Sequence, residues 1–521
     1  MAKSYLMAID AGSGSVRAIL FDTLGNQISS VSREWVHPTD PRFPDSMDFD
    51  CIRNWKLICE CTNEVITKTK IDPNDIAAVS STCMREAIVL YDKDMHEIWA
   101  CANVDGRSKD EVKQLIDFDP ELEREIYTIT GEVYALGTLP RLLWVKNKMP
   151  EVYKQTTYVG MINDWITFKL SNVLAVEPSN GSTTGIIELK TRDWNREIPA
   201  KVGLKSDIFP KIIESGEVLG KVTPKAANEV GLSVGTLVVA GGGDAQLGCI
   251  GVGAVSDGDA SLFGGSHWQY EINTSSPKVD PDCAIRVNCH AIPNIWQYEA
   301  IAFNPGLVMR WYRDAFCQQE KEIAYKTNRD VYDLMNEKAK GIPAGSNGMM
   351  ACFSDTMNFI NWVHSAPTFT NFGLDADKFN KYTFYRSLME NAAFVSRSHM
   401  EAVSELSGKK IDSLTFAGGA SKSPLWCQII ADIMGVKVKV PVVNEATALG
   451  CAILAGVGAK IYNNVEDAAK KLVKIKEVYT PNPENKNIYD QLYNRWKTVY
   501  KAQLDLVRSG VTTSMWKAPG L

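Results

Sequence analysis

The beginning of the chain alternates strand-like apolar runs with short polar turns. Runs at Tyr5–Asp10, Ser15–Asp22 and Gln27–Trp35 are separated by turn residues, which predicts three consecutive strands, the first two joined as a hairpin. A helix is predicted over Asn54–Ile66, followed by a strand at Ile76–Ser80. Three strands, a helix and a further strand form an order that departs from a simple doubly wound sheet.

A second hairpin opens the other half of the chain. The segment Asp259–Asn273, DASLFGGSHWQYEIN, again places small residues between two strand-like runs, and alternating strands and helices follow it. We therefore predict an α/β protein with two related domains, residues 1–248 and 249–521, whose hairpin turns face a shared cleft. Two unrelated hairpins are the alternative.

The turn of the first hairpin combines small residues with charged ones. Such a turn leaves several backbone N–H groups free to point into one concavity, which binds phosphate oxygens without net positive charge. Arg17 can add a charge-assisted hydrogen bond to a phosphoryl group, and Asp10 can hold Mg²⁺ through its waters. The alternative is an ordinary hairpin with a surface acid. The predicted phosphate turn consists of Gly12, Ser13, Gly14 and Ser15.

Asp244 follows three glycines at the end of a predicted strand, Leu237–Ala240, and a helix is predicted to start at Ala245. An acid delivered at a glycine-rich strand end, where substrate can come close, suits a general base for a hydroxyl. Asp244 as an ordinary helix N-cap is the alternative, and it does not exclude that role.

The segment Leu414–Gly435, LTFAGGASKSPLWCQIIADIMG, predicts a strand, a Gly-Gly loop and a helix. Ser423 is the expected N-cap and Pro424 the first helical residue. Gly418 and Gly419 allow a flat ring to lie against the backbone.

Composition narrows the class of protein. A chain of 521 residues with 45% apolar residues predicts a folded protein of several domains. The formal charge of −6, without a long basic block, gives no support for a nucleic-acid or membrane surface. The twelve cysteines form no C-x-x-C pair, so we expect reduced, mostly buried thiols in a cytoplasmic protein and no zinc.

The apolar stretch Ala446–Val457 is shorter than the roughly 20 residues that span a bilayer. The sequence contains neither a P-loop nor the protein-kinase motifs.

Together, the hairpin turn, the GGGD loop, the second hairpin and the Gly-Gly loop resemble those of the FGGY carbohydrate kinases, over nearly the whole chain. YALGTLPRLLW (Tyr134–Trp144) and Gly373–Phe394 resemble the two signature regions of the family, with Arg141 where many members have lysine. The resemblance implies two ribonuclease-H-like domains of the actin and hexokinase superfamily around a catalytic cleft. It places substrate and phosphate on the N-terminal domain and the nucleotide on the C-terminal domain.

The resemblance also implies a role for each matching residue. Asp244 falls on the catalytic base and Asp10 on the acid associated with Mg²⁺, whereas the first turn and Arg17 fall on the first phosphate motif. Many members have threonine where Gly265 stands in the second phosphate loop, so a hydroxyl contact is missing there. That loop consists of Gly264, Gly265 and Ser266. The adenosine motif matches Gly418, Gly419 and Ala420.

Arg85 and Glu86 match the pair with which glycerol kinases bind substrate hydroxyls. A donor fork beside an acceptor can satisfy two neighbouring hydroxyls, and a local ion pair is the alternative. Trp268 is either an aromatic wall of the substrate pocket or a core residue. The region where glycerol kinases have a tryptophan contains Asn103, Asp105 and Arg107 instead, which fits a different, oxygen-rich substrate.

Several further segments resemble family members that phosphorylate an open-chain sugar derivative, 4,5-dihydroxypentane-2,3-dione, on its terminal hydroxyl. These segments are residues 84–92, 98–108, 177–185, 309–317 and 512–521. This implies direct transfer of the ATP γ-phosphoryl group with Mg²⁺. A kinase of a pentulose or another small polyol is the alternative enzyme, and an actin-like ATPase switch and a sugar sensor without turnover are alternatives from other classes. The Arg85-Glu86 pair and Asp244 argue against the switch, and Asp10 with Asp244 against the sensor.

Overall fold

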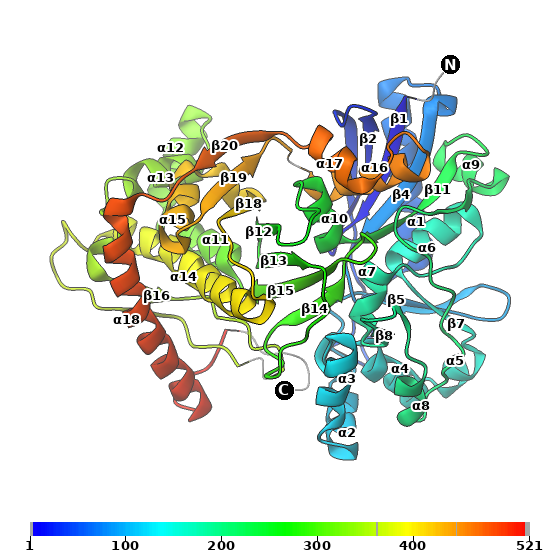
Figure 1. Ribbon diagram of the computed structural model, residues 1–521, viewed down its shortest axis with the longest axis horizontal. Coiled ribbons are helices and arrows are strands. Elements are labelled where there is room, and N and C mark those ends of the chain that lie inside the picture. The colour runs from blue at the N-terminus through cyan, green and yellow to red at the C-terminus, as the bar shows by residue number, and fades with distance from the viewer. Residues whose placement is uncertain (1–3, 361–362, 444, 516–521) are drawn as a thin grey trace.

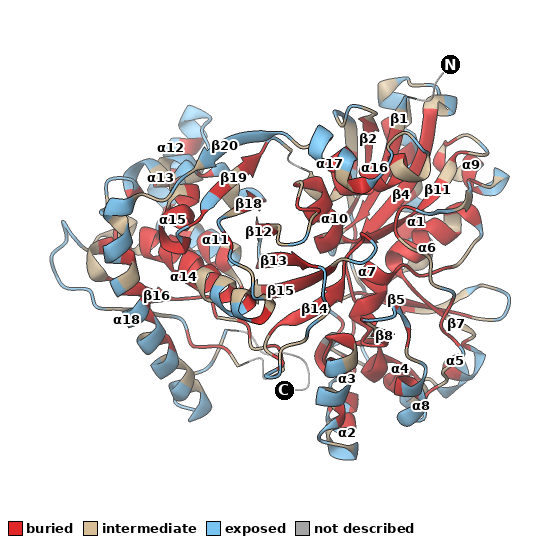
Figure 2. Cartoon of the chain, viewed as in Figure 1, coloured by how far each residue is buried: buried red, intermediate tan, exposed pale blue. Residues whose placement is uncertain are grey.

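The structure is a computed structural model that describes residues 4–360, 363–443 and 445–515; the last part of the 512–521 segment lies outside the described residues. The chain forms two α/β halves side by side, with N-terminal elements in one and most C-terminal elements in the other (Figure 1). Buried residues concentrate on the strands and on the helix faces that cover them, whereas the outer ends of the peripheral helices are exposed (Figure 2).

The first sheet has the strand order β10-β11-β4-β1-β2-β3. Strand β1 pairs antiparallel with β2 and parallel with β4, and β4 pairs parallel with β11. The bounds of these strands are β1 Tyr5–Ala11, β2 Ser15–Asp22, β3 Gln27–Glu34, β4 Ile76–Cys83, β10 Val218–Lys221 and β11 Leu237–Gly243.

The second sheet repeats this pairing pattern in the order β14-β15-β13-β12-β18-β19-β20. Strand β12 pairs antiparallel with β13 and parallel with β18, as β1 does with β2 and β4. Two related halves, each opening with a hairpin, were predicted, and the repeated topology confirms them. The bounds are β12 Ala260–Gly264, β13 Trp268–Thr274, β14 Arg286–Cys289, β15 Trp296–Ala302, β18 Ser413–Ala417, β19 Lys437–Pro441 and β20 Ile475–Tyr479.

Helices cover both sheets. The first sheet packs against α1 (Cys51–Thr69), α6 (Ile162–Ser171) and α16 (Ala446–Gly458). The second sheet and its flanking strands pack against α14 (Lys381–Ser407) and α15 (Pro424–Met434), and α18 (Pro483–Arg508) lies against α15. The predicted helix Asn54–Ile66 lies within α1, because Asp50 caps the helix earlier by accepting from the Arg53 N–H at 2.9 Å.

The link between the halves is helix α10 (Asp244–Gly251), which packs against α16 (Figure 1). Helix α16 comes from the C-terminal part of the chain yet contacts β1, β4 and β11 of the first sheet. A smaller sheet, β6 (Glu97–Cys101), β5 (Ile88–Tyr91) and β7 (Tyr158–Met161), flanks the first half. No helix in the described ranges is long and apolar enough to cross a membrane.

Candidate active site

Three parallel strands end at one edge of the first sheet and deliver the main charged residues there. Cys83 at the end of β4 is level with Ala11 of β1 on one side and with Gly243 of β11 on the other. Asp10, Arg85 and Asp244 therefore lie at adjacent carboxyl ends, the usual location of sites in α/β sheets. The parallel register brings together residues that are far apart in sequence.

The three glycines before Asp244 allow the backbone of β11 to approach its neighbours closely. A Cβ at Gly241 would lie 1.6 Å from the Ser81 carbonyl oxygen, and one at Gly242 would lie 2.8 Å from Ser179 Oγ. Any side chain there would therefore push the strand end away. Gly243 occupies the N-cap position of α10, so that Asp244 is the first helical residue and not the cap.

The Asp244 carboxylate faces the guanidinium of Arg85, with Oδ1 3.4 Å from Nε. Its side chain keeps 42% of its surface exposed. Burial of the surrounding edge raises the pKa of Asp244 to about 6, against the lowering effect of Arg85 and with a further increase from Glu86. A carboxyl group with this pKa is ionised at neutral pH and still basic enough to accept a hydroxyl proton.

The first hairpin turn exposes its backbone amides at the same edge. Ser13 and Gly14 are exposed, and their N–H groups make no hydrogen bond to the described residues. The carbonyl groups of the turn are occupied instead, because Trp35 Nε1 donates to the Gly12 oxygen at 3.0 Å and a ring nitrogen of His37 lies 2.7 Å from the Ser13 oxygen. The turn therefore presents donors, as an anion-binding concavity requires.

Arg17 lies between two carboxylates. Its Nε is 3.9 Å from Asp10 Oδ2, and its Nη1 pairs with Glu445, which immediately precedes α16. Burial raises the pKa of Asp10 to about 6, Arg17 opposes this, and Asp244 and Glu445 add to it. Asp10 therefore carries unbalanced negative charge, the condition under which a cation binds.

The second hairpin turn and the Gly-Gly loop, predicted from separate segments, come together in the other half. The oxygen of Gly264 would lie 2.9 Å from a Cβ at Gly418, whose φ of +92° also favours glycine. A pocket of about 330 Å³ opens beside them. Its lining includes Gly264, Gly265, Ser266, Tyr332, Asn336, Gly419, Ala420 and Lys422. As predicted, Ser423 caps the following helix by accepting from the Trp426 N–H at 3.2 Å.

Glu86 has a strained backbone beside the site. Its φ of +63° is unusual for a residue with a side chain, and two contacts hold it there. Its N–H donates to Thr183 Oγ1 at 3.2 Å, and Arg141 Nη1 donates to its carbonyl oxygen. Arg141 Nη2 also donates to the Asn103 carbonyl at 2.7 Å, so one buried guanidinium joins two of the predicted substrate residues.

Asn103 in turn reaches the phosphate turn, because its Nδ2 donates to Ser13 Oγ at 3.1 Å. Asp105 does not face the site in this way. Its carboxylate is fully buried and accepts from the Met47 N–H at 2.7 Å and from Arg107 Nε at 2.8 Å. The Arg107 guanidinium lies 5.2 Å from the ring centroid of Trp99 and 4.9 Å from that of Trp144. These contacts give Asp105 and Arg107 a structural position behind the site.

Trp268 has no exposed surface and belongs to the core of the second half. Its ring centroid lies 4.8 Å from that of Trp426 and 5.4 Å from that of Phe416. This is the position of a core residue, so the prediction of an aromatic pocket wall is corrected.

Sequence reasoning missed several charged residues that contact the predicted ones. Two lie on strands of the second half, one lies directly before α16, and one lies just after α3 (Leu122–Thr130). No spacing in the sequence links these four residues to the site. They are Glu132, Arg286, Glu299 and Glu445.

Both halves match models of one protein family. Residues 5–251 match the N-terminal domain of the FGGY family of carbohydrate kinases, and residues 272–459 match its C-terminal domain. The chain belongs to the FGGY family of carbohydrate kinases. This confirms the resemblance inferred from the four glycine-rich segments.

Relatives in this family align over almost the whole chain. The autoinducer-2 kinase of Enterobacter sp. (strain 638) is 49% identical over 519 residues, covering 99% of this chain and 98% of the relative. The autoinducer-2 kinase of Escherichia coli (strain K12 / DH10B) is 47% identical and covers 100% of this chain and 98% of the relative.

Solved FGGY structures share the fold at lower identity. The xylulose kinase from Rhodospirillum rubrum superimposes with a TM-score of 0.85 at 21% identity, covering 98% of this chain and 100% of that one. Plasmodium falciparum glycerol kinase with ADP gives a TM-score of 0.81 at 18% identity, covering 96% of this chain and 98% of that one. These likenesses confirm the predicted two-domain α/β architecture.

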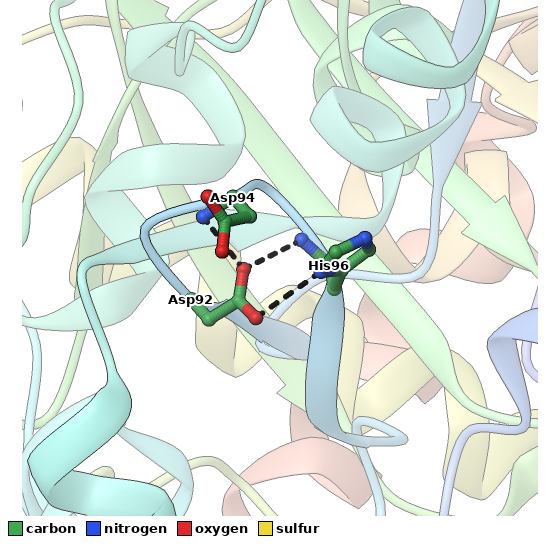
Figure 3. A group of neighbouring side chains, drawn as sticks. All are labelled: Asp92, Asp94 and His96. Carbon is green, nitrogen blue, oxygen red and sulfur yellow. Dashed lines mark hydrogen bonds and ion pairs between the residues drawn. The ribbon is translucent and has the colours of Figure 1, made fainter.

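One acidic cluster lies away from this FGGY site. Asp92, Asp94 and His96 gather on the turn between β5 and β6 (Figure 3). The Asp92 carboxylate accepts from the N–H groups of Asp94 and His96, both at 2.9 Å. These bonds close the turn, and we assign no metal to it.

Proposed function

We propose that this FGGY kinase transfers the γ-phosphoryl group of ATP to the terminal hydroxyl of 4,5-dihydroxypentane-2,3-dione, the open-chain form of autoinducer-2. The product is phospho-autoinducer-2, formed in the cytoplasm. The identity of 47–49% to autoinducer-2 kinases over the full chain supports the choice of acceptor. The carboxylate of Asp244 beside Arg85, at the end of a parallel strand, is the observation that carries the reaction type.

In this proposal the acceptor binds between Arg85, Glu86 and Asn103. A guanidinium donates to carbonyl or hydroxyl oxygens and a carboxylate accepts from hydroxyls, so the pair suits a molecule with adjacent oxygens. Asp244 accepts the proton of the attacking hydroxyl, which makes the oxygen a better nucleophile. The free amides of the first turn stabilise charge on the transferred phosphoryl group.

ATP is assigned to the pocket between the second turn and the Gly-Gly loop. Its glycines leave room for the nucleotide beside the backbone, and Tyr332, Asn336 and Lys422 supply polar and aromatic contacts. The amides around Gly265 and Ser266 are the second set of phosphate donors. The exposed turns of the two halves then hold the phosphate chain from both sides.

The residues at the edge of the first sheet fit Mg²⁺. Asp10 lies close enough to Asp244 and Glu445 for each to raise its pKa, so a divalent cation would relieve their repulsion. Mg²⁺ is bound by one or two carboxylates together with phosphate oxygens, and Asp10 is the residue that would hold it. When bound, the cation neutralises developing charge on the phosphoryl oxygens.

The test is an ADP-coupled assay of the purified chain with Mg²⁺ and ATP. It compares the dione with xylulose, ribulose, glycerol and no acceptor. We expect turnover on the dione well above that on the other acceptors. Higher turnover on a pentulose would identify the pentulose as the acceptor in place of the dione. ATP hydrolysis at the same rate with and without an acceptor would favour an ATPase switch.

Asp244→Asn is the matching test of the base. It keeps the shape of the side chain and removes its basicity, so kcat should fall about 10²-fold or more while ATP binding is unchanged. Asp92→Asn is a control for an acid-to-amide change away from the site, and its kcat should match that of the parent protein. Near-normal turnover of Asp244→Asn would refute the assignment.

A further inference from the structure

The second sheet presents a row of polar and charged side chains on a buried face. In the strand register, Ser261 pairs with Glu271, Glu271 with Glu299, and Glu299 with Arg286. Residues directly opposite one another on neighbouring strands project from the same face. All four are at most 3% exposed. A buried sheet face normally carries apolar side chains, so this row requires an explanation.

The row ends in an ion network that crosses between the two halves. Arg286 of β14 donates from Nη2 to Glu86 Oε1 at 2.6 Å and from Nε to Glu132 Oε1 at 2.5 Å, both in the N-terminal half. It also donates from Nη1 to Glu299 Oε1 at 3.2 Å. The other oxygen of Glu299, Oε2, pairs with Nη2 of Arg85 at 2.7 Å. Each half therefore supplies one arginine to a carboxylate of the other.

Only part of the row is charged. Burial and the neighbouring Glu299 raise the pKa of Glu271 well above its ordinary value, so Glu271 is a neutral acid. Against the effect of burial, Arg85 and Arg286 lower the pKa of Glu299, which is ionised. Removing the charge of Glu299 would leave two buried guanidinium groups short of a partner, whereas Glu271 has no charge to lose.

This network holds the groups to which the proposed function assigns the acceptor. Glu86 has a left-handed backbone, and Arg286 binds only its Oε1, so that no described residue takes Oε2. Arg85 has Nη2 fixed by Glu299 while its Nε remains beside Asp244. Contacts from the second half therefore leave one oxygen of Glu86 without a partner among the described residues and hold Arg85 Nε beside Asp244.

We propose that Arg286 and Glu299 are positioning residues for the acceptor, which fix Arg85 and Glu86 from the opposite domain. This inference rests on the proposed function, because it takes Arg85 and Glu86 as the acceptor-binding pair. The acceptor site of the N-terminal half is then complete only when the second sheet is docked against it. The lining of the pocket assigned to ATP includes neither Arg286 nor Glu299.

The test measures kcat and KM for the acceptor and for ATP separately. Arg286→Gln should raise the acceptor KM at least tenfold and leave the ATP KM within twofold. Arg286→Lys keeps the charge but loses the fork, so it should recover part of the loss. Arg386→Gln is the matched control, because Arg386 is also a buried arginine paired with a carboxylate, Glu390, but lies in α14. An unchanged acceptor KM in Arg286→Gln, or an equal rise in Arg386→Gln, would overturn the proposal.

A second pair of variants covers the case in which Arg286→Gln does not fold. Glu299→Gln and Glu271→Gln make the same substitution at neighbouring buried positions. We expect a raised acceptor KM for Glu299→Gln and a parental value for Glu271→Gln. Loss of folding in both Arg286→Gln and Glu299→Gln, with Glu271→Gln folded, would make the network purely structural and also overturn the proposal.

The choice of acceptor is tested independently by the parental protein. If the parental protein phosphorylates a pentulose and not the dione, the acceptor in the proposed function is wrong. The variants are then compared on that pentulose, and the change in its KM decides the role of Arg286 and Glu299.

Discussion

Ser179 Oγ accepts a hydrogen bond of 3.0 Å from the N–H of Gly243, the residue immediately before Asp244. The same hydroxyl lies 2.6 Å from Glu177 Oε2, to which it donates. Glu177 also accepts from the N–H groups of Ser179 and Asn180, so its position is fixed. The start of helix α10, and with it the direction of the Asp244 carboxylate, is thereby tied to a buried acid.

Ser179→Ala should therefore lower kcat in protein that still folds. Loss of the hydroxyl frees the Gly243 amide, and a small displacement of Asp244 should cost about tenfold in kcat with little change in the KM for ATP. Ser396→Ala is the control, since the Ser396 hydroxyl is equally buried but, among the described residues, donates only to the Ala392 carbonyl of its own helix. Steady-state kinetics of both variants decide the point. A kcat of Ser179→Ala equal to that of Ser396→Ala would show that Ser179 does not position the base.

The acid limb of the pH profile should report Asp244. Its pKa of about 6 means that the carboxylate is protonated progressively below pH 6 and can no longer accept the hydroxyl proton. The logarithm of kcat/KM for the acceptor should fall with a slope of about one below that pH. Saturating Mg²⁺ keeps Asp10, which has a similar pKa, in its ionised form. A flat profile down to pH 5, in protein that regains full activity at pH 8, would contradict this assignment.

Asp10→Asn should stabilise the protein without Mg²⁺ and nucleotide. The folded-state pKa of Asp10 is raised, so its ionised form is disfavoured by folding, and stability is lost as pH rises through about 6. The asparagine variant avoids this loss and should gain about 3 kcal/mol at pH 8, a difference that should become small near pH 4. Thermal unfolding across this pH range measures it. A variant less stable than the parent at pH 8 would mean that the pair with Arg17 outweighs the cost of burial.

Much of the fold followed from local pattern. The strands around the first turn were predicted almost to the residue because turn residues mark their ends, and Ser423 and Pro424 marked the start of α15. The end of β11 was placed too early, at Ala240, because glycines have low strand propensity. There the strand is stabilised by close packing against β4, which a single sequence does not reveal.

Candidate site residues could be predicted from sequence only where one short segment holds all of them. The turn at residues 12–15 and the loop at Gly418 are of this kind, and their roles in binding phosphate and nucleotide stay predictions. Arg286 and Glu299 are not, because their contacts depend on strand pairing and reach residues about 200 positions away. Trp268 shows that a local pattern can fit two positions, since an aromatic residue next to a glycine-rich turn can line a pocket or fill a core. Which of the two it occupies depends on Trp426, far along the chain.

Gly418→Ala should weaken ATP binding. A Cβ at this position would lie 2.9 Å from the Gly264 oxygen, so the Gly-Gly loop and the second turn would have to separate, and both border the nucleotide pocket. We expect a KM for ATP raised about tenfold or more, with the KM for the acceptor little changed. Gly408→Ala controls for backbone strain, because Gly408 also has a positive φ, +70°, but has no atom within 4 Å of the added Cβ. Gly408→Ala should lose about 1 kcal/mol of stability from its αL conformation. Gly418→Ala should lose more, because its φ of 92° and ψ of −174° lie in a region almost restricted to glycine, and only this variant should lose ATP affinity. An equal ATP KM in the two variants would show that the contact with Gly264 does not shape the nucleotide pocket.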